Sequence, residues 1–227
     1  MNWLVNNLDL VLELSLQHVR LAVLPIVLGF ALSLPIGWLA WRFRFSRGLV
    51  LTVIGLLYTI PSLALFVLLP PALGISFLSE LNVTIALTVY AVALMTRSVT
   101  EGLAAVGPSV RVAATAMGYS TWGRFWRVEF PLAGPVMLAG LRVVAVSTVS
   151  LVTVGVFVGV RSLGYLFTDG LQRGIVLEIV TGIVMTVVIA LLLDLVLVVL
   201  GRILMPWQRL FAPSATVRRL QTARPAA

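Results

Sequence analysis

Residues 175–200 read IVLEIVTGIVMTVVIALLLDLVLVVL, and this stretch decides the fold class. Glu178 and Asp194 are its only charged residues, and its apolar positions lack the alternation of a barrel strand. A helix of roughly 20 apolar residues crosses a bilayer core about 30 Å thick, and lipid offers an extended backbone no hydrogen-bond partners. The stretch therefore predicts a transmembrane helix.

Four more apolar stretches lie upstream of this one. Together the five run from Leu21 to Trp41, Leu49 to Leu69, Leu81 to Arg97, Val136 to Val158 and Ile175 to Leu200. The third is the shortest, and we expect its helix to continue toward Leu103. The pattern predicts an all-α membrane protein with about five transmembrane helices.

Composition supports the same fold class and excludes several functions. The 227 residues are 60% hydrophobic, with a mean hydropathy of +1.11, and leave room for one helical bundle. All basic residues are arginine, so the chain lacks the lysine that a nucleotide-binding phosphate loop requires. With no cysteine and one histidine, neither thiolate nor paired-histidine metal sites are expected. We expect no cofactor in this chain, and any ATP, with its magnesium, would have to be handled by another subunit.

The two ends of the chain differ from the apolar middle. Leu8, Leu12 and Leu16 recur at four-residue spacing among charged residues, which predicts an interfacial helix over residues 1–20 on the outer side. His18 is expected at the surface, and no cleaved signal peptide is expected. Residues 21–205 form the predicted transmembrane domain. The tail over 206–227 is basic, predicted to be disordered and attracted to anionic lipid.

The distribution of arginine predicts the orientation. One side of the membrane receives Arg42, Arg44, Arg47, Arg97, Arg111, Arg124, Arg127, Arg142, Arg202, Arg209, Arg218, Arg219 and Arg224, and the other only Arg20, Arg161 and Arg173. Loops rich in arginine stay in the cytoplasm. We therefore expect the N-terminus outside and the C-terminus inside, and we assign the net charge of +8 to membrane topology rather than to nucleic-acid binding.

Residues 98–135 make the only long cytoplasmic connection expected. Val110 to Met117 is predicted to be a helix stopped by Gly118, and a second short helix, capped by Ser120 or Thr121, is expected to end before Pro131. On this second helix Trp122 and Trp126 share a face, and Arg124 and Arg127 project from another side. One face can be buried, and the other can pair with acidic groups of a partner.

The connection resembles the loop of binding-protein-dependent ABC importer permeases, whose pattern is Glu-Ala-Ala, three residues, Gly, nine residues, Ile, one residue, Leu-Pro. The matching positions are Ala113, Ala114, Gly118, Val128 and Pro131, with Phe130 in place of leucine and Val112 in place of glutamate. The resemblance implies a type I, MetI-like fold and docking on an ATPase subunit through this pattern together with Tyr119, Trp122, Arg124, Trp126 and Arg127. It also implies a second permease subunit, an external solute-binding protein and a bacterial inner-membrane location.

Two further segments resemble the permeases for glycine betaine, carnitine and choline. These segments are Tyr58-Thr59-Ile60-Pro61-Ser62-Leu63-Ala64 and Ser162-Leu163-Gly164-Tyr165-Leu166-Phe167. The resemblance implies an osmoprotectant importer, and an importer of another small solute such as an amino acid stays open. An ion-driven transporter or a membrane enzyme is less favoured, because the chain shows neither internal repeats nor clustered acidic residues.

Polar residues within the spans are candidates for the translocation path. They are Thr59, Pro61 and Ser62 in the second span and Ser147, Thr148, Ser150 and Thr153 in the fourth. Such residues either line a path or pack helices closely. Arg142 and Asp194 lie at similar depth, and we expect them to form an ion pair. Glu178 either faces a water-filled vestibule or reaches the headgroups.

Overall fold

The computed structural model describes residues 2–207, and these residues contain helices and no strand. In chain order the helices are α1 (Asn2–Asn6), α2 (Leu8–Arg42), α3 (Arg44–Thr59), α4 (Ser62–Leu73), α5 (Glu80–Ala105), α6 (Pro108–Ala116), α7 (Thr121–Arg124), the π-helical turn η1 (Phe125–Glu129), α8 (Phe130–Val152), the 3-10 helix η2 (Thr153–Val158), α9 (Gly164–Arg173) and α10 (Val176–Leu204). The all-α membrane fold expected from the sequence is confirmed.

Four helical segments are long and apolar enough to cross a membrane: α2, α5, the continuous segment Thr121–Val158 and α10. Helices α3 and α4 together are also long and apolar enough, but the pair is bent by 102° at its break. If the bent pair is counted as one span, it is the fifth. The predicted second span, Leu49 to Leu69, is therefore not a straight helix. The third continues to Ala105, past Leu103 as expected.

Pro61 causes the bend between α3 and α4, because it lacks the backbone donor that an uninterrupted helix would need there. The break leaves the carbonyl of Ile60 without a helical partner, and the Tyr90 hydroxyl of α5 donates a hydrogen bond to it. The Tyr58 ring packs edge-on against Tyr90, with ring centroids 5.8 Å apart. The break at Pro61 is thus held in place by contacts with α5.

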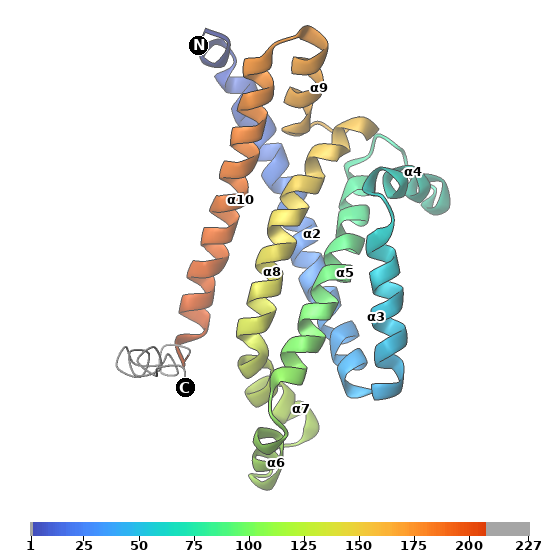
Figure 1. Ribbon diagram of the computed structural model, residues 1–227, viewed down its shortest axis with the longest axis vertical. Coiled ribbons are helices and arrows are strands. Elements are labelled where there is room, and N and C mark those ends of the chain that lie inside the picture. The colour runs from blue at the N-terminus through green and yellow to red at the C-terminus, as the bar shows by residue number, and fades with distance from the viewer. Residues whose placement is uncertain (1, 208–227) are drawn as a thin grey trace, which may run out of the picture.

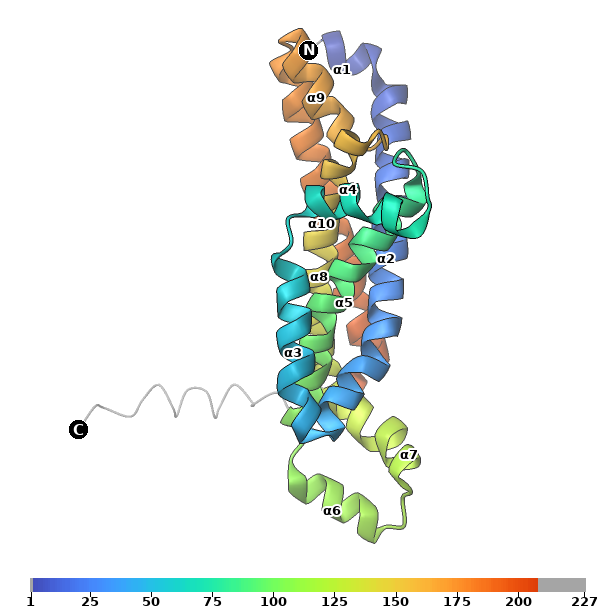
Figure 2. The same cartoon turned by 90° about the vertical axis from the view of Figure 1, so that its right-hand side faces the viewer.

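The long helices stand side by side, with α8 and α5 central and α2 behind them (Figure 1). Viewed from the side, α4 runs across the bundle, and α6 and α7 project beyond one end (Figure 2). Helices α2 and α5 meet closely through glycines: a Cβ on Gly29 would lie 2.3 Å from the Cβ of Ala91, and one on Gly37 would lie 2.6 Å from Cγ1 of Val99. The absence of a side chain at Gly29 and Gly37 therefore allows α2 and α5 to approach closely.

Two polar residues are buried where the sequence predicted exposure. His18 is fully buried between α2 and α8, and its Nε2 lies 3.0 Å from the Val149 carbonyl. Glu178 is also fully buried, because α9 folds over the first turn of α10 and brings Asp169 beside it. The predictions of a surface histidine and of a vestibule- or headgroup-facing glutamate are wrong. Both residues become buried through contacts between helices distant in sequence.

The N-terminal segment and the first long helix of the bundle are joined in one helix, α2. Residue 20 lies inside α2, so the segment expected at the interface continues without a break into the first long helix. Residues 208–227, which include most of the predicted basic tail, lie outside the described part of the chain.

Candidate functional site

The connecting loop, residues 106–129, joins α5 to α8 and is built as the sequence predicted in its first half. Helix α6 starts at Pro108 and is followed by Gly118 in the left-handed conformation, with a φ of +84°. The Ser120 side chain then caps α7 by accepting a hydrogen bond from the Gly123 backbone N–H at 3.2 Å. The predicted helix, glycine turn and second helix are all present.

The sequence predicts that the second helix of the connecting loop ends before Pro131, and this prediction is wrong. It continues through η1 directly into α8, where Pro131 occupies the first turn. In η1 the Phe130 N–H bonds to the Phe125 carbonyl, five residues back, so the helix accommodates an extra residue just before the proline. The loop helix and the span are therefore one continuous element, Thr121–Val158.

An internal brace ties the two halves of the connecting loop together. Arg124 donates from Nε to the Glu129 carboxylate at 2.8 Å and from Nη1 to the Thr115 hydroxyl at 2.8 Å. Only 1% of Glu129 is exposed. Arg124, expected to pair with a partner protein, is thus paired within the chain. The sequence did not predict this role of Glu129, because Glu129 lies five residues from Arg124. Two residues at that spacing lie on the same side of a helix only across a π turn.

The other loop residues predicted to dock a partner lie mostly on the surface. Ala113, Gly118, Trp122, Trp126 and Arg127 are exposed, Tyr119, Val128 and Pro131 are half-buried, and Ala114 is buried. Gly118, Tyr119, Trp122, Trp126 and Arg127 line one hollow of about 470 Å³. Val112, in the position of the motif glutamate, is 68% exposed. The hollow and these exposed apolar side chains form a surface suited to protein contact.

Aromatic stacking supports the loop from inside. Phe125 is buried, and its ring lies 6.3 Å from that of Trp38 on α2 and 5.0 Å from that of Trp126. Arg111 of α6 lies over the Trp41 ring at 5.3 Å. These contacts attach both halves of the connecting loop to the end of α2.

Within the bundle, Arg142 of α8 and Asp194 of α10 form an ion pair. The Arg142 Nε and Nη2 donate to the two carboxylate oxygens at 2.6 and 2.7 Å. The pair lies in a groove of about 620 Å³ between α8 and α10, which Ser147 also lines. A bidentate geometry satisfies both charges at a depth where an unpaired charge would be costly.

The residues predicted for the translocation path are not gathered in one place. Thr59, Pro61 and Ser62 mark the break between α3 and α4, whereas Thr148 is buried and Ser150 is exposed on α8. The Thr153 hydroxyl bonds to the Ser150 carbonyl at 2.6 Å where α8 changes to η2. Of the seven, only Ser147 lines the α8–α10 groove.

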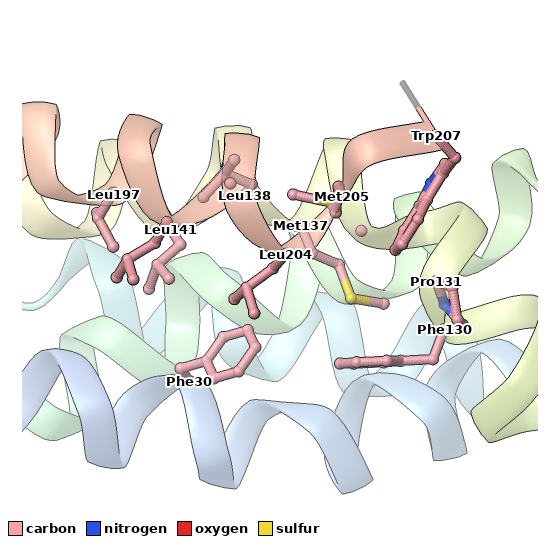
Figure 3. A pocket seen from close by; sticks show the side chains of 13 residues that line it. Phe30, Phe130, Pro131, Met137, Leu138, Leu141, Leu197, Leu204, Met205 and Trp207 are labelled. Carbon is pink, nitrogen blue, oxygen red and sulfur yellow. The ribbon is translucent and has the colours of Figure 1, made fainter. Parts of the chain in front are cut away.

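Two other cavities were not predicted. A groove of about 700 Å³ between α3 and α5 contains Tyr58, Arg47 and the exposed Arg97–Glu101 pair. An apolar cavity of about 400 Å³ lies between α2, α8 and α10, where Phe30, Met137 and Leu204 point toward one another (Figure 3). No group of residues suited to hold a metal ion occurs within residues 2–207.

Comparison with known proteins agrees with this architecture. The chain is 28% identical to the osmoprotectant import permease protein OsmW of Salmonella typhimurium, over 80% of this chain and 85% of the relative. It is 30% identical to the carnitine transport permease protein OpuCB of Listeria monocytogenes, over 69% and 70%. The fold matches a chain of the MetNI methionine ABC transporter in an inward-facing conformation, with a TM-score of 0.76, 21% identity and coverage of 87% of this chain and 97% of that one.

The match to a family extends over most of the bundle. Residues 26–210 match the binding-protein-dependent transport system inner membrane component family, a range that includes the connecting loop and all the long helices except the start of α2. The motif positions around Gly118 and Pro131 lie within it. The chain therefore belongs to the family of binding-protein-dependent transport system inner membrane components.

Proposed function

We propose that this chain is the permease subunit of an ATP-driven importer of osmoprotectants such as glycine betaine, carnitine or choline. The named functions of the relatives support this substrate class. ATP and magnesium bind to a separate ATPase, since this chain has no lysine for a phosphate loop. The observation that carries the coupling role is the continuous helix from the connecting loop into α8.

The connecting loop transmits the movement of the ATPase. A partner that grips the hollow around Gly118 and Trp122 pulls on α7, and α7 is continuous with α8 through η1. The Arg124 brace makes α6 follow the same movement. Closure of the ATPases then shifts α8 within the bundle, so that the path opens alternately to the two sides.

The complete transporter needs more than one chain. Two permease subunits enclose the path, two ATPases bind the connecting loops, and an external binding protein delivers the substrate. The arginine asymmetry supports a cytoplasmic connecting loop and C-terminus, with the N-terminus outside a bacterial inner membrane. Lipid surrounds the apolar outer faces of the long helices.

Reconstitution tests this function directly. Permease, ATPase and loaded binding protein are assembled in proteoliposomes, and uptake of radiolabelled glycine betaine, choline and methionine is followed with ATP on the ATPase side. We expect ATP-dependent uptake of the osmoprotectants and none of methionine. Uptake driven by an ion gradient without ATP would refute the proposal.

A cross-linking experiment tests the docking surface separately. A photoreactive residue in place of Tyr119, which lines the loop hollow, is expected to cross-link to the ATPase. The same residue in place of Leu171, which is 75% exposed on α9 at the opposite end of the bundle, is the control. Equal cross-linking at both positions, or at neither, would refute docking at the connecting loop.

A further inference from the structure

The groove between α8 and α10 presents charge at its surface rather than burying it. The side chains of Arg142 and Asp194 are 43% and 25% exposed there, among apolar neighbours such as Val143, Val146 and Leu191. A charged side chain at this depth of a span is stable when it faces water or a partner and is costly when it faces lipid. The groove therefore belongs to a water-accessible or protein-covered face.

The ion pair in this groove leaves hydrogen-bonding capacity unused. A guanidinium carries five N–H donors in a planar fork, and Arg142 directs its Nε and Nη2 edge to Asp194. Among residues 2–207, no hydrogen bond is found from Nη1, so the second edge of the fork is open. Each carboxylate oxygen of Asp194 likewise accepts one hydrogen bond and keeps a free lone pair. The pair is satisfied internally, yet it can still bind a ligand from the groove.

We infer that this groove holds a binding site for a zwitterion in transit, with the carboxylate of the ligand on the open edge of Arg142 and its ammonium group against Asp194. The inference rests on the proposed function and adds the site at which the permease itself contacts substrate. The ligand aligns antiparallel to the ion pair, so that each charge meets an opposite one. Ser147 lines the same groove and supplies a hydroxyl beside the pair.

Charge balance decides the class of ligand. Arg142 and Asp194 together carry no net charge, and a zwitterion adds none. A pure cation or anion would leave one charge unbalanced in a groove with apolar walls, where an uncompensated charge is costly. The site therefore fits betaines, carnitine and amino acids better than it fits choline.

The competing role of the pair is a tether between α8 and α10, and one double variant separates the two roles. Arg142→Gln with Asp194→Asn replaces both residues by amides that can still hydrogen-bond between the helices, and it removes both charges. A tether tolerates this exchange, whereas a site for zwitterions loses the groups that bind the ligand. The matched control is Arg20→Gln with Glu80→Gln, an exposed ion pair at 3.6 Å that also joins two helices.

The experiment uses the full transporter in proteoliposomes, with binding protein, ATP and radiolabelled glycine betaine as the probe. We expect uptake by the double variant to fall by about tenfold or more, which corresponds to one lost charge-assisted hydrogen bond to the substrate. The variant should still co-purify with the ATPase. The control variant should transport at the wild-type rate.

Each outcome is decisive. Wild-type uptake by the double variant would overturn the zwitterion site and leave the proposed function standing. Loss of uptake together with loss of ATPase co-purification would assign the pair to a structural role and overturn the site as well. A wild-type transporter that imports no glycine betaine would overturn the proposed function and this inference with it.

Discussion

Replacing Arg124 by methionine should release the connecting loop from its brace. Arg124 makes two hydrogen bonds of 2.8 Å, one to the carboxylate of Glu129 and one to the hydroxyl of Thr115. The variant keeps most of the side-chain length but leaves the Glu129 carboxylate without its partner. Only 2% of the Glu129 side chain is exposed, so water cannot replace that partner. Removing one partner of a buried pair costs about 3–5 kcal/mol.

This energy predicts a measurable increase in loop opening. At about 1.4 kcal/mol per factor of ten, the open population rises roughly a hundredfold or more. Amide hydrogen exchange in peptides covering residues 108–130, followed by mass spectrometry, measures the change. Protection should fall there and remain at the wild-type level in α5 and α10. Coupling of ATP hydrolysis to uptake should weaken in the same variant, because α6 no longer follows α7.

Two controls make this prediction refutable. Arg127→Met alters an exposed arginine on the same helix and should leave exchange unchanged. Arg124→Met combined with Glu129→Leu removes both charges together and should recover most of the protection, since an apolar pair tolerates burial. Exchange in Arg124→Met within about threefold of the wild type would show that the brace does not hold the loop, because even a 1 kcal/mol loss exceeds that change.

Three other predictions concern the stability of the bundle, measured as the melting temperature of the purified protein in detergent. Tyr90→Phe removes the hydrogen bond at the α3–α4 break and should cost about 1–2 kcal/mol; an unchanged melting temperature would contradict it. Gly29→Ala overpacks the contact with α5 and should cost about 1–3 kcal/mol, whereas Gly48→Ala, which meets no atom within 4 Å, should not destabilise. In α9, outside the spans, burial favours a raised pKa for Asp169, but the hydrogen bond from Arg173 and its charge outweigh burial and hold that pKa below its ordinary value. The stabilisation by the charged Asp169 carboxylate is therefore present above the pKa that Asp169 has in the unfolded chain, and it is lost at lower pH. The melting temperature of Asp169→Asn should show its full deficit relative to the wild type at pH 7, and this deficit should shrink below about pH 4. A deficit that grows on acidification would contradict this.

Local sequence was sufficient wherever one segment decides its own structure. The apolar stretches determined the long helices, since lipid leaves the backbone no alternative to internal hydrogen bonds. Gly118 and Ser120 determined the turn and the cap in the connecting loop, because left-handed backbone and an N-cap depend on the residue itself. The motif around Gly118 and Pro131 could be recognised from the sequence for the same reason, because it lies within one continuous segment.

Contacts between distant segments were decided only in the tertiary structure. His18 and Glu178 read as exposed because nothing near them in sequence indicates that α8 and α9 cover them. The Arg124–Glu129 brace depends on a π turn that changes the facing of two residues. Hydrophobic patterning determines that a helix crosses the membrane, but packing determines which of its polar groups find partners. The inferred substrate site is an example, because it depends on the hydrogen-bond donors of Arg142 that the pairing with Asp194 leaves unused.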